Sequence, residues 1–192
     1  MIANRQSHFM TPEEYLEWEQ HQEERHEYLD GEVIAMTGSS LFHNDIALNL
    51  YTALRPHVRA RGCRINVSDA KVKVNATTYF YPDLVVSCDD RDRAATQLFQ
   101  YPKVIVEVLS PSTEAYDRGK KFTQYRTLPT LQEYILIDTT EMSVDCYRRG
   151  EGRQWWLAPY VVGDTVTLES VEFSCPIELF YEDVQLESID AN

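Results

Sequence analysis

The sequence predicts one α/β domain in which a mixed β-sheet is flanked by helices and followed by a β-rich C-terminal extension. Three observations support this fold class. Apolar residues recur at helical spacing over residues 43–61, near-continuous apolar runs typical of buried strands occupy residues 84–86 and 104–109, and alternating runs follow residue 142. The chain has 192 residues, which suits a single domain over residues 1–192, with a core from about residue 11 to residue 181.

A short helix and a hairpin are expected near the N-terminus. Thr11 is a favourable N-cap residue, Pro12 suits the first helical position, and the acids that follow suit the first turn. These signals predict a helix to about Glu19. The pair Asp30-Gly31 lies between two short apolar runs and is a turn signal, so it predicts a β-hairpin.

The long helix expected at residues 43–61 contains Pro56, which predicts a kink or a shorter helix. Two alternating runs after it, residues 63–67 and 70–74, predict half-exposed strands. A second helix is expected over residues 113–128. Further strands are expected at residues 133–138, 142–147, 155–160 and 166–168.

Composition excludes several classes of protein. No apolar run approaches the roughly 18 residues of a membrane span, and the N-terminus lacks the apolar core of a signal peptide, so we expect a cytoplasmic protein without membrane contact. Neither GxGxxG nor GxxxxGK[ST] occurs, so a nucleotide cofactor is not expected. Widely spaced cysteines without a CxxC pair predict reduced core residues rather than a zinc site or a disulfide framework. These are Cys63, Cys88, Cys146 and Cys175.

The charge distribution bears on the choice of partner. The net charge is −13, but the acids concentrate in residues 13–32 and 164–192, which leaves a basic middle. A local basic face can meet phosphates on an acidic protein, although an ordinary solvated surface produces the same pattern. One basic group, opposed only by Asp69, contains Arg55, Arg59, Arg61, Arg64, Lys71 and Lys73. A second contains Arg118, Lys120, Lys121 and Arg126.

Two carboxylates interrupt runs that otherwise read as buried strands. Asp83 opens the run LVV, and Glu107 lies within VIVEVL on the same predicted face as Ile105 and Leu109. A bare carboxylate in a buried strand is strongly unfavourable unless it is paired, protonated or bound to a cation. If the two strands are neighbours, both acids can bind one ion, and oxygen ligands suit Mg²⁺ or Mn²⁺. A Glu107–arginine pair and a turn role for Asp83 are the alternatives.

A cationic side chain for this site is expected on the helix that follows. Asp117 and Lys121 are four residues apart and therefore share one helical face. An ammonium there could orient a water molecule and stabilise developing negative charge, whereas the same spacing also forms an ordinary helical ion pair. Candidates from the first part of the chain are the acids Glu27, Asp30 and Glu32, together with His43, which is a ligand or a capping residue.

In their order and spacing these stretches resemble the PD-(D/E)xK nuclease superfamily, and more closely a bacterial branch of restriction endonucleases within it. The resemblance covers residues 11–181 and is carried by ERHEYLDGEVIAMTG, HNDIALNL, SDAKVKV, YPDLVV, VIVEVLSPST, DRGKKFTQYR and LQEYILID. It implies a restriction-endonuclease-like core and Mg²⁺-dependent hydrolysis of DNA phosphodiester bonds.

The resemblance also implies roles for individual residues. Asp83 corresponds to the motif aspartate and Glu107 to the motif glutamate, and both would bind the metal. The motif lysine would stand at position 109, where this chain has Leu109. We therefore expect the lysine on the following helix, at Lys121 or else at Lys120.

A metal-dependent DNA endonuclease is the leading hypothesis. The alternatives are a catalytically inactive nuclease-like module that binds nucleic acid or a protein, and a hydrolase of small phosphoesters with a closed pocket. The resemblance also implies a homodimer, because nucleases that cut both strands often pair. Trp155, Trp156 and Tyr160 offer an apolar surface for it, unless they belong to the core. Glu27 is the expected additional acid. Nucleic-acid contacts are expected from Lys120, Arg118, Lys71 and Lys73.

Overall fold

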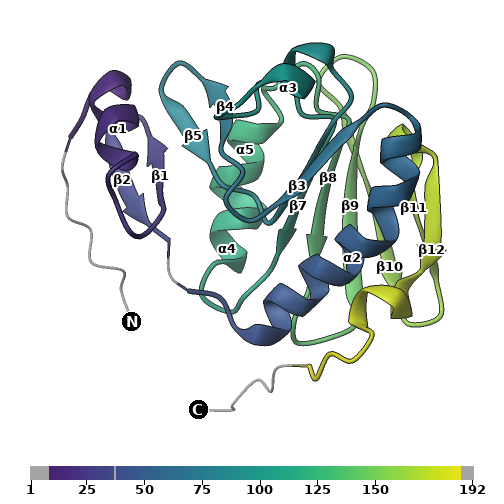
Figure 1. The fold of residues 1–192 in the computed structure, drawn as a ribbon. Coiled ribbons are helices and arrows are strands. Elements are labelled where there is room, and N and C mark those ends of the chain that lie inside the picture. The colour runs from purple at the N-terminus through teal and green to yellow at the C-terminus, as the bar shows by residue number, and fades with distance from the viewer. Residues whose placement is uncertain (1–8, 37, 187–192) are drawn as a thin grey trace.

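The fold described here is that of a computed structural model, which describes residues 9–36 and 38–186. A six-stranded mixed sheet forms its centre (Figure 1). Its strand order is β10-β9-β8-β7-β6-β3, and β7 and β8 form its parallel pair. The strands are β3 (Arg64–Val67), β6 (Leu84–Ser87), β7 (Val104–Val108), β8 (Glu133–Ile137), β9 (Ser143–Arg149) and β10 (Trp155–Val161).

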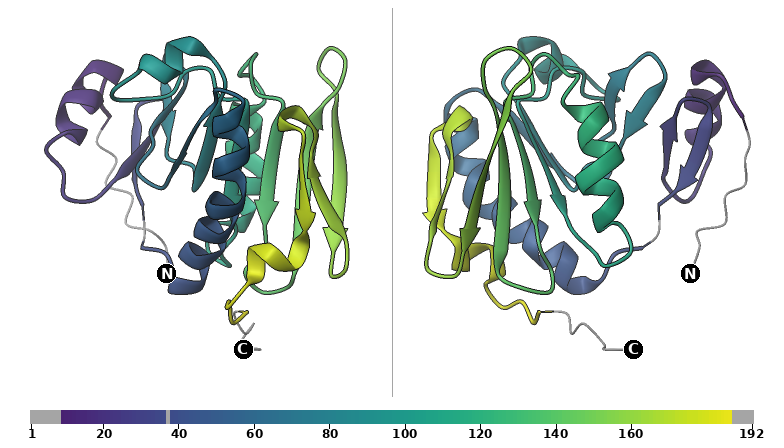
Figure 2. Two further views of the ribbon diagram at one scale, coloured as in Figure 1. Left: turned by 45° about the vertical axis from the view of Figure 1, so that its right-hand side comes forward. Right: turned by 180° about the vertical axis from the view of Figure 1, so that it is seen from behind.

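Helices cover both faces of this sheet, as Figures 1 and 2 show. On one face lies α2 (Leu41–Ala60), whose Ile46 and Leu50 belong to the same buried cluster as Val104 and Val106. The opposite face carries α4 (Glu114–Tyr116), a π-helical turn (Asp117–Lys121) and α5 (Phe122–Tyr125), with a second buried cluster around Ile105. The alternation expected along β7 is therefore confirmed: Ile105 and Leu109 face one layer, and the valines face the other.

A smaller antiparallel sheet of order β2-β1-β5-β4 lies at the N-terminal end, next to α1 (Pro12–Glu19). The predicted hairpin is confirmed: Asp30 and Gly31 both have positive φ, at 49° and 97°, as the tight turn requires. Thr11 caps α1 through a capping box with Glu14. The strands are β1 (His26–Leu29), β2 (Glu32–Ala35), β4 (Val72–Asn75) and β5 (Thr78–Phe80), of which β5 was not predicted.

Two helices differ from the sequence prediction. The proline at position 56 does not shorten α2, which runs unbroken to Ala60. The helix expected over residues 113–128 is divided by the π-helical turn at Asp117–Lys121. Such turns are rare and change the direction of the side chains they carry, and they occur often at functional sites.

The C-terminal extension is confirmed as β-structure packed beside α2. The strands β11 (Thr165–Leu168) and β12 (Phe173–Pro176) form a two-stranded sheet, drawn yellow-green to yellow in Figure 1. A 3-10 helix (Ile177–Tyr181) then returns to α2, where the Asn49 side chain donates a hydrogen bond to the Phe180 carbonyl at 3.2 Å. The remaining short helices are α3 (Asp90–Ala94) and a 3-10 turn (Glu169–Val171).

The edge strand β10 carries the aromatic residues from which a homodimer was predicted. Trp156 is 64% exposed, whereas Trp155 packs edge-on against Phe122 at 5.4 Å between ring centroids. Tyr160 accepts a hydrogen bond from Arg148 at 2.6 Å. Only part of the expected apolar surface is therefore exposed, and the homodimer stays a prediction that the mass of the chain in solution tests.

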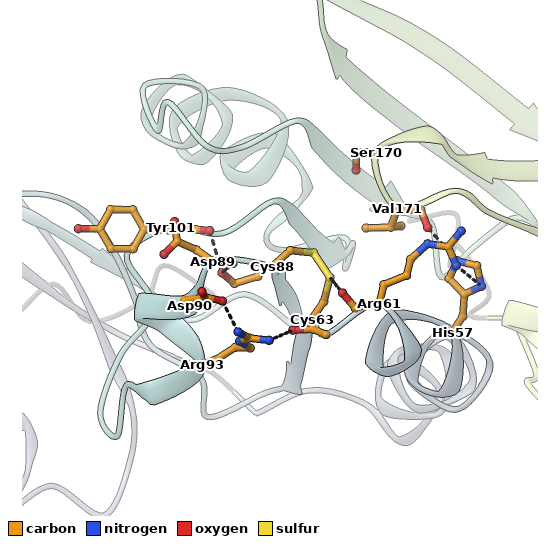
Figure 3. Close-up of a disulfide and its surroundings, with 12 residues drawn as sticks. His57, Arg61, Cys63, Cys88, Asp89, Asp90, Arg93, Tyr101, Ser170 and Val171 are labelled. Atoms are coloured by element: carbon orange, nitrogen blue, oxygen red, sulfur yellow. Dashed lines mark hydrogen bonds and ion pairs between the residues drawn. A yellow bond between two sulfur atoms is a disulfide. The ribbon is translucent and has the colours of Figure 1, made fainter.

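The prediction of four reduced cysteines is wrong. Cys63 and Cys88 form a disulfide (Figure 3), while Cys146 and Cys175 are free and buried. The pairing follows from strand register: β3 and β6 are antiparallel with Arg64 opposite Ser87, so the next pair outward joins the two cysteines. Their separation of 25 residues concealed this contact in the sequence.

We expect this disulfide to contribute about 3 to 4 kcal/mol to stability, because it closes a 25-residue loop in the unfolded chain. Urea unfolding of the oxidised protein, compared with the protein in dithiothreitol, measures the difference. The double variant Cys63→Ala, Cys88→Ala is the control, since dithiothreitol should leave its midpoint unchanged. An equal shift in both proteins would contradict the assignment of the effect to this bond.

No helix within the described residues is both long enough and apolar enough to cross a membrane.

Candidate active site

A cavity of about 130 Å³ opens where the small sheet, the start of α2 and the π-helical turn meet the ends of β6 and β7. Its lining is unusual for its number of ionisable groups. The side chains that matter for the chemistry are Glu27, His43, Asp83, Glu107, Asp117 and Lys121.

The structure brings the two predicted metal ligands together. Leu84 pairs with Val106 across β6 and β7, so the next position outward sets Asp83 opposite Glu107 on adjacent strands. Asp83 accepts a hydrogen bond from the Val108 N–H, with 2.7 Å between N and Oδ2. The neighbouring strands thus hold the aspartate at the end of the sheet.

His43 connects α2 to this pair. Ser40 caps the helix by accepting a hydrogen bond from the His43 N–H at 3.2 Å, which sets the imidazole in the first turn. Its Nε2 lies 2.9 Å from Oδ1 of Asp83. His43 therefore does more than occupy a helix start: it holds the second oxygen of the predicted metal-binding aspartate.

Lys121 lies at the centre of the remaining acids. Its Nζ is 2.9 Å from Oε1 of Glu27, 3.0 Å from Oε1 of Glu107 and 3.4 Å from Oδ1 of Asp117. Lys121 is 6% exposed, whereas Lys120 is exposed to solvent. Of the two lysines considered from the sequence, Lys121 is thus the one that meets the carboxylates.

Glu27 is also the acid from the hairpin that reaches the site. Its Oε1 accepts a hydrogen bond from the Tyr81 N–H at 3.4 Å in addition to the contact with Lys121. Asp30 instead accepts a hydrogen bond from the Thr77 hydroxyl at 2.6 Å, on the surface of the small sheet. Glu32 belongs to β2 but is not among the described residues that line the cavity.

Sequence reasoning missed Tyr125. Its hydroxyl donates a hydrogen bond to Oε1 of Glu107 at 3.1 Å, so this oxygen receives both the phenol and the ammonium of Lys121. Lys121 and Tyr125 are four residues apart and therefore share one helical face, and this spacing was visible in the sequence. Buried tyrosines usually find such a partner.

Burial dominates the electrostatics of the cluster. It raises the pKa of Glu107 well above 4.5, and the charges of Asp117 and Asp83 raise it further, while Lys121 lowers it in part. Burial likewise raises the pKa of Glu27 and of Asp117. Burial lowers the pKa of Lys121, but the negative charges of Glu107 and Glu27 raise it by more. The pKa of Lys121 therefore lies well above 10.5. The site therefore has more acids than its one ammonium can compensate.

The donor set fits a hard divalent cation by its chemistry. Carboxylate oxygens are the ligands that Mg²⁺ and Mn²⁺ prefer, and excess negative charge in a buried site attracts such an ion. Within the described chain, Oε2 of Glu27 and Oε2 of Glu107 accept no hydrogen bond. As the side chains lie, however, no three acids, histidines or cysteines of residues 9–36 and 38–186 converge on one point. Asp83 and Glu107 fit the ion, with Lys121 close beside them.

The expected nucleic-acid contacts are dispersed rather than gathered at the cavity. Arg118 is held by Glu114 at 2.8 Å and by Asp145 at 2.5 Å. Lys71 lies over the ring of Tyr15 at 4.9 Å, and burial lowers its pKa. Neither these two residues nor Lys73 and Lys120 belong to the described lining of the cavity.

Comparison with known proteins places this chain in a family. A family model with the description "Uma2: Putative restriction endonuclease" matches residues 12–178. The chain belongs to the Uma2 family. Membership confirms the resemblance inferred from the sequence motifs.

Relatives of this Uma2 protein include two proteins of Synechocystis sp. that carry the names uncharacterized protein slr1290 and uncharacterized protein sll1609. The first is 43% identical over 173 residues, which cover 90% of this chain and 91% of the relative. The second is 36% identical over 167 residues, or 83% of this chain and 92% of the relative.

A solved structure has the same fold. The crystal structure of a putative nuclease from Anabaena variabilis, which belongs to DUF820, superposes with a TM-score of 0.73 and covers 90% of this chain and 98% of its own. At 19% identity the match concerns the fold alone. It supports the mixed α/β architecture described above.

Proposed function

We propose that this protein is a metal-dependent endonuclease that hydrolyses phosphodiester bonds in DNA. One observation carries the proposal: Asp83 and Glu107 stand opposite each other on adjacent strands, with the ammonium of Lys121 at 3.0 Å from Glu107. This is the combination that the sequence motifs predicted. Family membership supports the reaction class.

Each residue has a role that its contacts support. Asp83 and Glu107 would hold Mg²⁺ or Mn²⁺, which when bound polarises a phosphate oxygen and lowers the pKa of bound water. Lys121 orients the attacking water and stabilises negative charge as it develops on the phosphate. His43 positions Asp83, and Tyr125 positions Glu107, through the hydrogen bonds described above.

A catalytically inactive module that binds nucleic acid or a protein is the second candidate. It is favoured by the contacts of Lys121, which meets three carboxylates at once and so forms a closed ion network. A hydrolase of small phosphoesters has less support. The cavity of about 130 Å³ is well below the roughly 300 Å³ at which pockets begin to enclose a small ligand.

Removal of the divalent ion tests the proposal. Supercoiled plasmid incubated with the purified protein should become nicked or linear in Mg²⁺ or Mn²⁺ and should stay intact in EDTA, because the buried carboxylates need the cation to approach a phosphate. Plasmid conversion is read on agarose gels over time. Plasmid binding without conversion in either metal would favour the inactive module.

A further inference from the structure

A second cavity, of about 340 Å³, lies between the C-terminal half of α2 and the edge strand β3. Four arginines line it, and the described lining contains no acid. Cys63 of the disulfide lines it too, and Figure 3 shows the neighbouring Arg93 reaching toward the chain beside Cys63. We call this cavity the arginine groove and define it by Tyr51, Arg55, Arg59, Arg64, Asn66 and Arg93.

Three of the four guanidinium groups have no carboxylate partner among residues 9–36 and 38–186. Arg55 and Arg59 are exposed, one helical turn apart on α2, and no carboxylate of the described residues lies within 4.0 Å of either. Elsewhere the pattern is mixed. Arg61, Arg91 and Arg118 hold carboxylates at 2.5, 2.7 and 2.8 Å. No carboxylate of the described residues lies within 4.0 Å of Arg126, Arg149 or Arg153, so the groove is distinguished by gathering three such guanidinium groups in one cavity.

Arg64 is the cation of the groove that three hydrogen bonds hold in place. Its Nη1 donates to the main-chain carbonyls of Asp92 and Ala95 at 3.0 and 2.6 Å, and its Nε donates to Oδ1 of Asn66 at 3.1 Å. These neutral partners hold the guanidinium in place without neutralising its charge. Arg93, by contrast, is ion-paired with Asp90.

This arrangement is unexpected in an acidic chain. Acids outnumber Lys and Arg by 31 to 18, yet the groove gathers uncompensated cations. Like charges one helical turn apart repel each other, so Arg55 and Arg59 destabilise α2 unless an anion lies between them. Guanidinium groups bind phosphate through two parallel hydrogen bonds, which makes a phosphate group the anion that suits four arginines best.

We propose that the arginine groove binds backbone phosphates of nucleic acid. This proposal rests on the function proposed above, because the groove would hold the same DNA strand that the candidate active site cleaves. His43 is at the start of α2, and Arg55 and Arg59 lie 12 and 16 residues further on, about 18 and 24 Å along the helix axis. Along the helix axis alone this separation equals about five to seven phosphate spacings of about 3.4 Å, so the groove would hold a part of the substrate strand that lies away from the scissile bond.

Charge reversal tests the groove directly. The double variant Arg55→Glu, Arg59→Glu is compared with Arg126→Glu, Arg153→Glu, which changes the net charge equally at two exposed arginines outside the groove. Fluorescence anisotropy of a labelled 30-bp duplex is measured in EDTA at several salt concentrations, and thermal unfolding verifies that both variants fold.

The groove variant should bind the duplex at least about tenfold more weakly than the parent. The slope of log K against log salt concentration should become less steep by about two, one for each lost phosphate contact. The control should stay within about twofold of the parent. Equal weakening in both variants would overturn the proposal, because only overall charge would then matter. A parent chain that fails to bind the duplex would overturn it as well.

A small phosphate-containing molecule is the other source of the same chemistry. Titration of the parent and the groove variant with inorganic phosphate, followed by thermal unfolding, separates the two. Stabilisation of the parent alone, together with unchanged duplex binding by the groove variant, would assign the groove to free phosphate and overturn the nucleic-acid proposal. If the parent protein binds the duplex through the groove but cleaves no plasmid, the proposal for the arginine groove holds. Only the proposed endonuclease activity is then contradicted.

Discussion

Replacing Glu107 with glutamine is expected to reduce plasmid cleavage at least about 100-fold while the domain stays folded. The carboxylate is one of the two proposed metal ligands, and metal-ion stabilisation of charge is worth several kcal/mol, at 1.36 kcal/mol for each factor of ten in rate. Glutamine keeps the shape and an acceptor oxygen for Lys121 and Tyr125, which lie 3.0 and 3.1 Å away. Initial rates of plasmid nicking in Mn²⁺ measure the change.

The stability of the Glu107→Gln variant separates a chemical effect from unfolding. Because burial raises the pKa of this carboxyl, its ionised form is unfavourable in the folded chain, and a neutral amide should change the free energy of unfolding at pH 7 by no more than about 1 kcal/mol. Glu151→Gln, at an exposed position of the β9–β10 turn, is the matched control and should cleave like the parent. Cleavage by Glu107→Gln at the control rate would remove the endonuclease proposal.

Replacing Lys121 with methionine should destabilise the protein by about 3 to 5 kcal/mol at pH 8, because it leaves buried carboxylates without their cation. The effect should depend strongly on pH. Burial raises the pKa values of Glu27 and Glu107 above 4.5, and that of Asp117 above 3.8, and loss of the ammonium raises them further. When a carboxyl group has a higher pKa in the folded chain than in the unfolded chain, the folded state keeps its full stability at pH values below the unfolded pKa. Its stability falls as pH rises through the folded pKa. At pH 5 the variant should therefore recover most of its stability.

Urea unfolding of the parent and the variant at pH 5 and pH 8 measures this difference. Lys120→Met is the matched control, since the neighbouring lysine is exposed and should show less than about 0.5 kcal/mol of change at either pH. The Lys121 ammonium persists across this range because its own pKa lies above 10.5. A destabilisation of equal size at both pH values would mean that lost packing, rather than unpaired carboxylates, explains the effect.

The residues of the candidate site could be predicted because their chemistry conflicts with their surroundings. Asp83 and Glu107 interrupt apolar strands, and such interruptions are visible in a sequence without any knowledge of the fold. The period of two along VIVEVL also predicted which face Glu107 occupies. The choice between Lys120 and Lys121 could not be made in this way. It depends on a π-helical turn, which no local signal predicted.

Contacts between distant residues were the main failure of prediction. The disulfide joins positions 25 residues apart, and the contact of His43 with Asp83 spans 40 residues. Both depend on how strands and helices pack, and a cysteine or a histidine looks the same in sequence whatever lies opposite it. The arginine groove was visible only as a basic stretch, because its lack of acids is a property of the surface between α2 and β3.

The sequence by itself determined the α/β class, most of the strands, the hairpin at Asp30-Gly31 and the two strand-borne acids of the candidate site, Asp83 and Glu107, since these follow from local periodicity and from the cost of burying charge. Only the tertiary structure decided which lysine meets the acids, which cysteines pair and where the uncompensated arginines gather. Those features arise from strand register and helix packing, which set the distances between residues far apart in the chain.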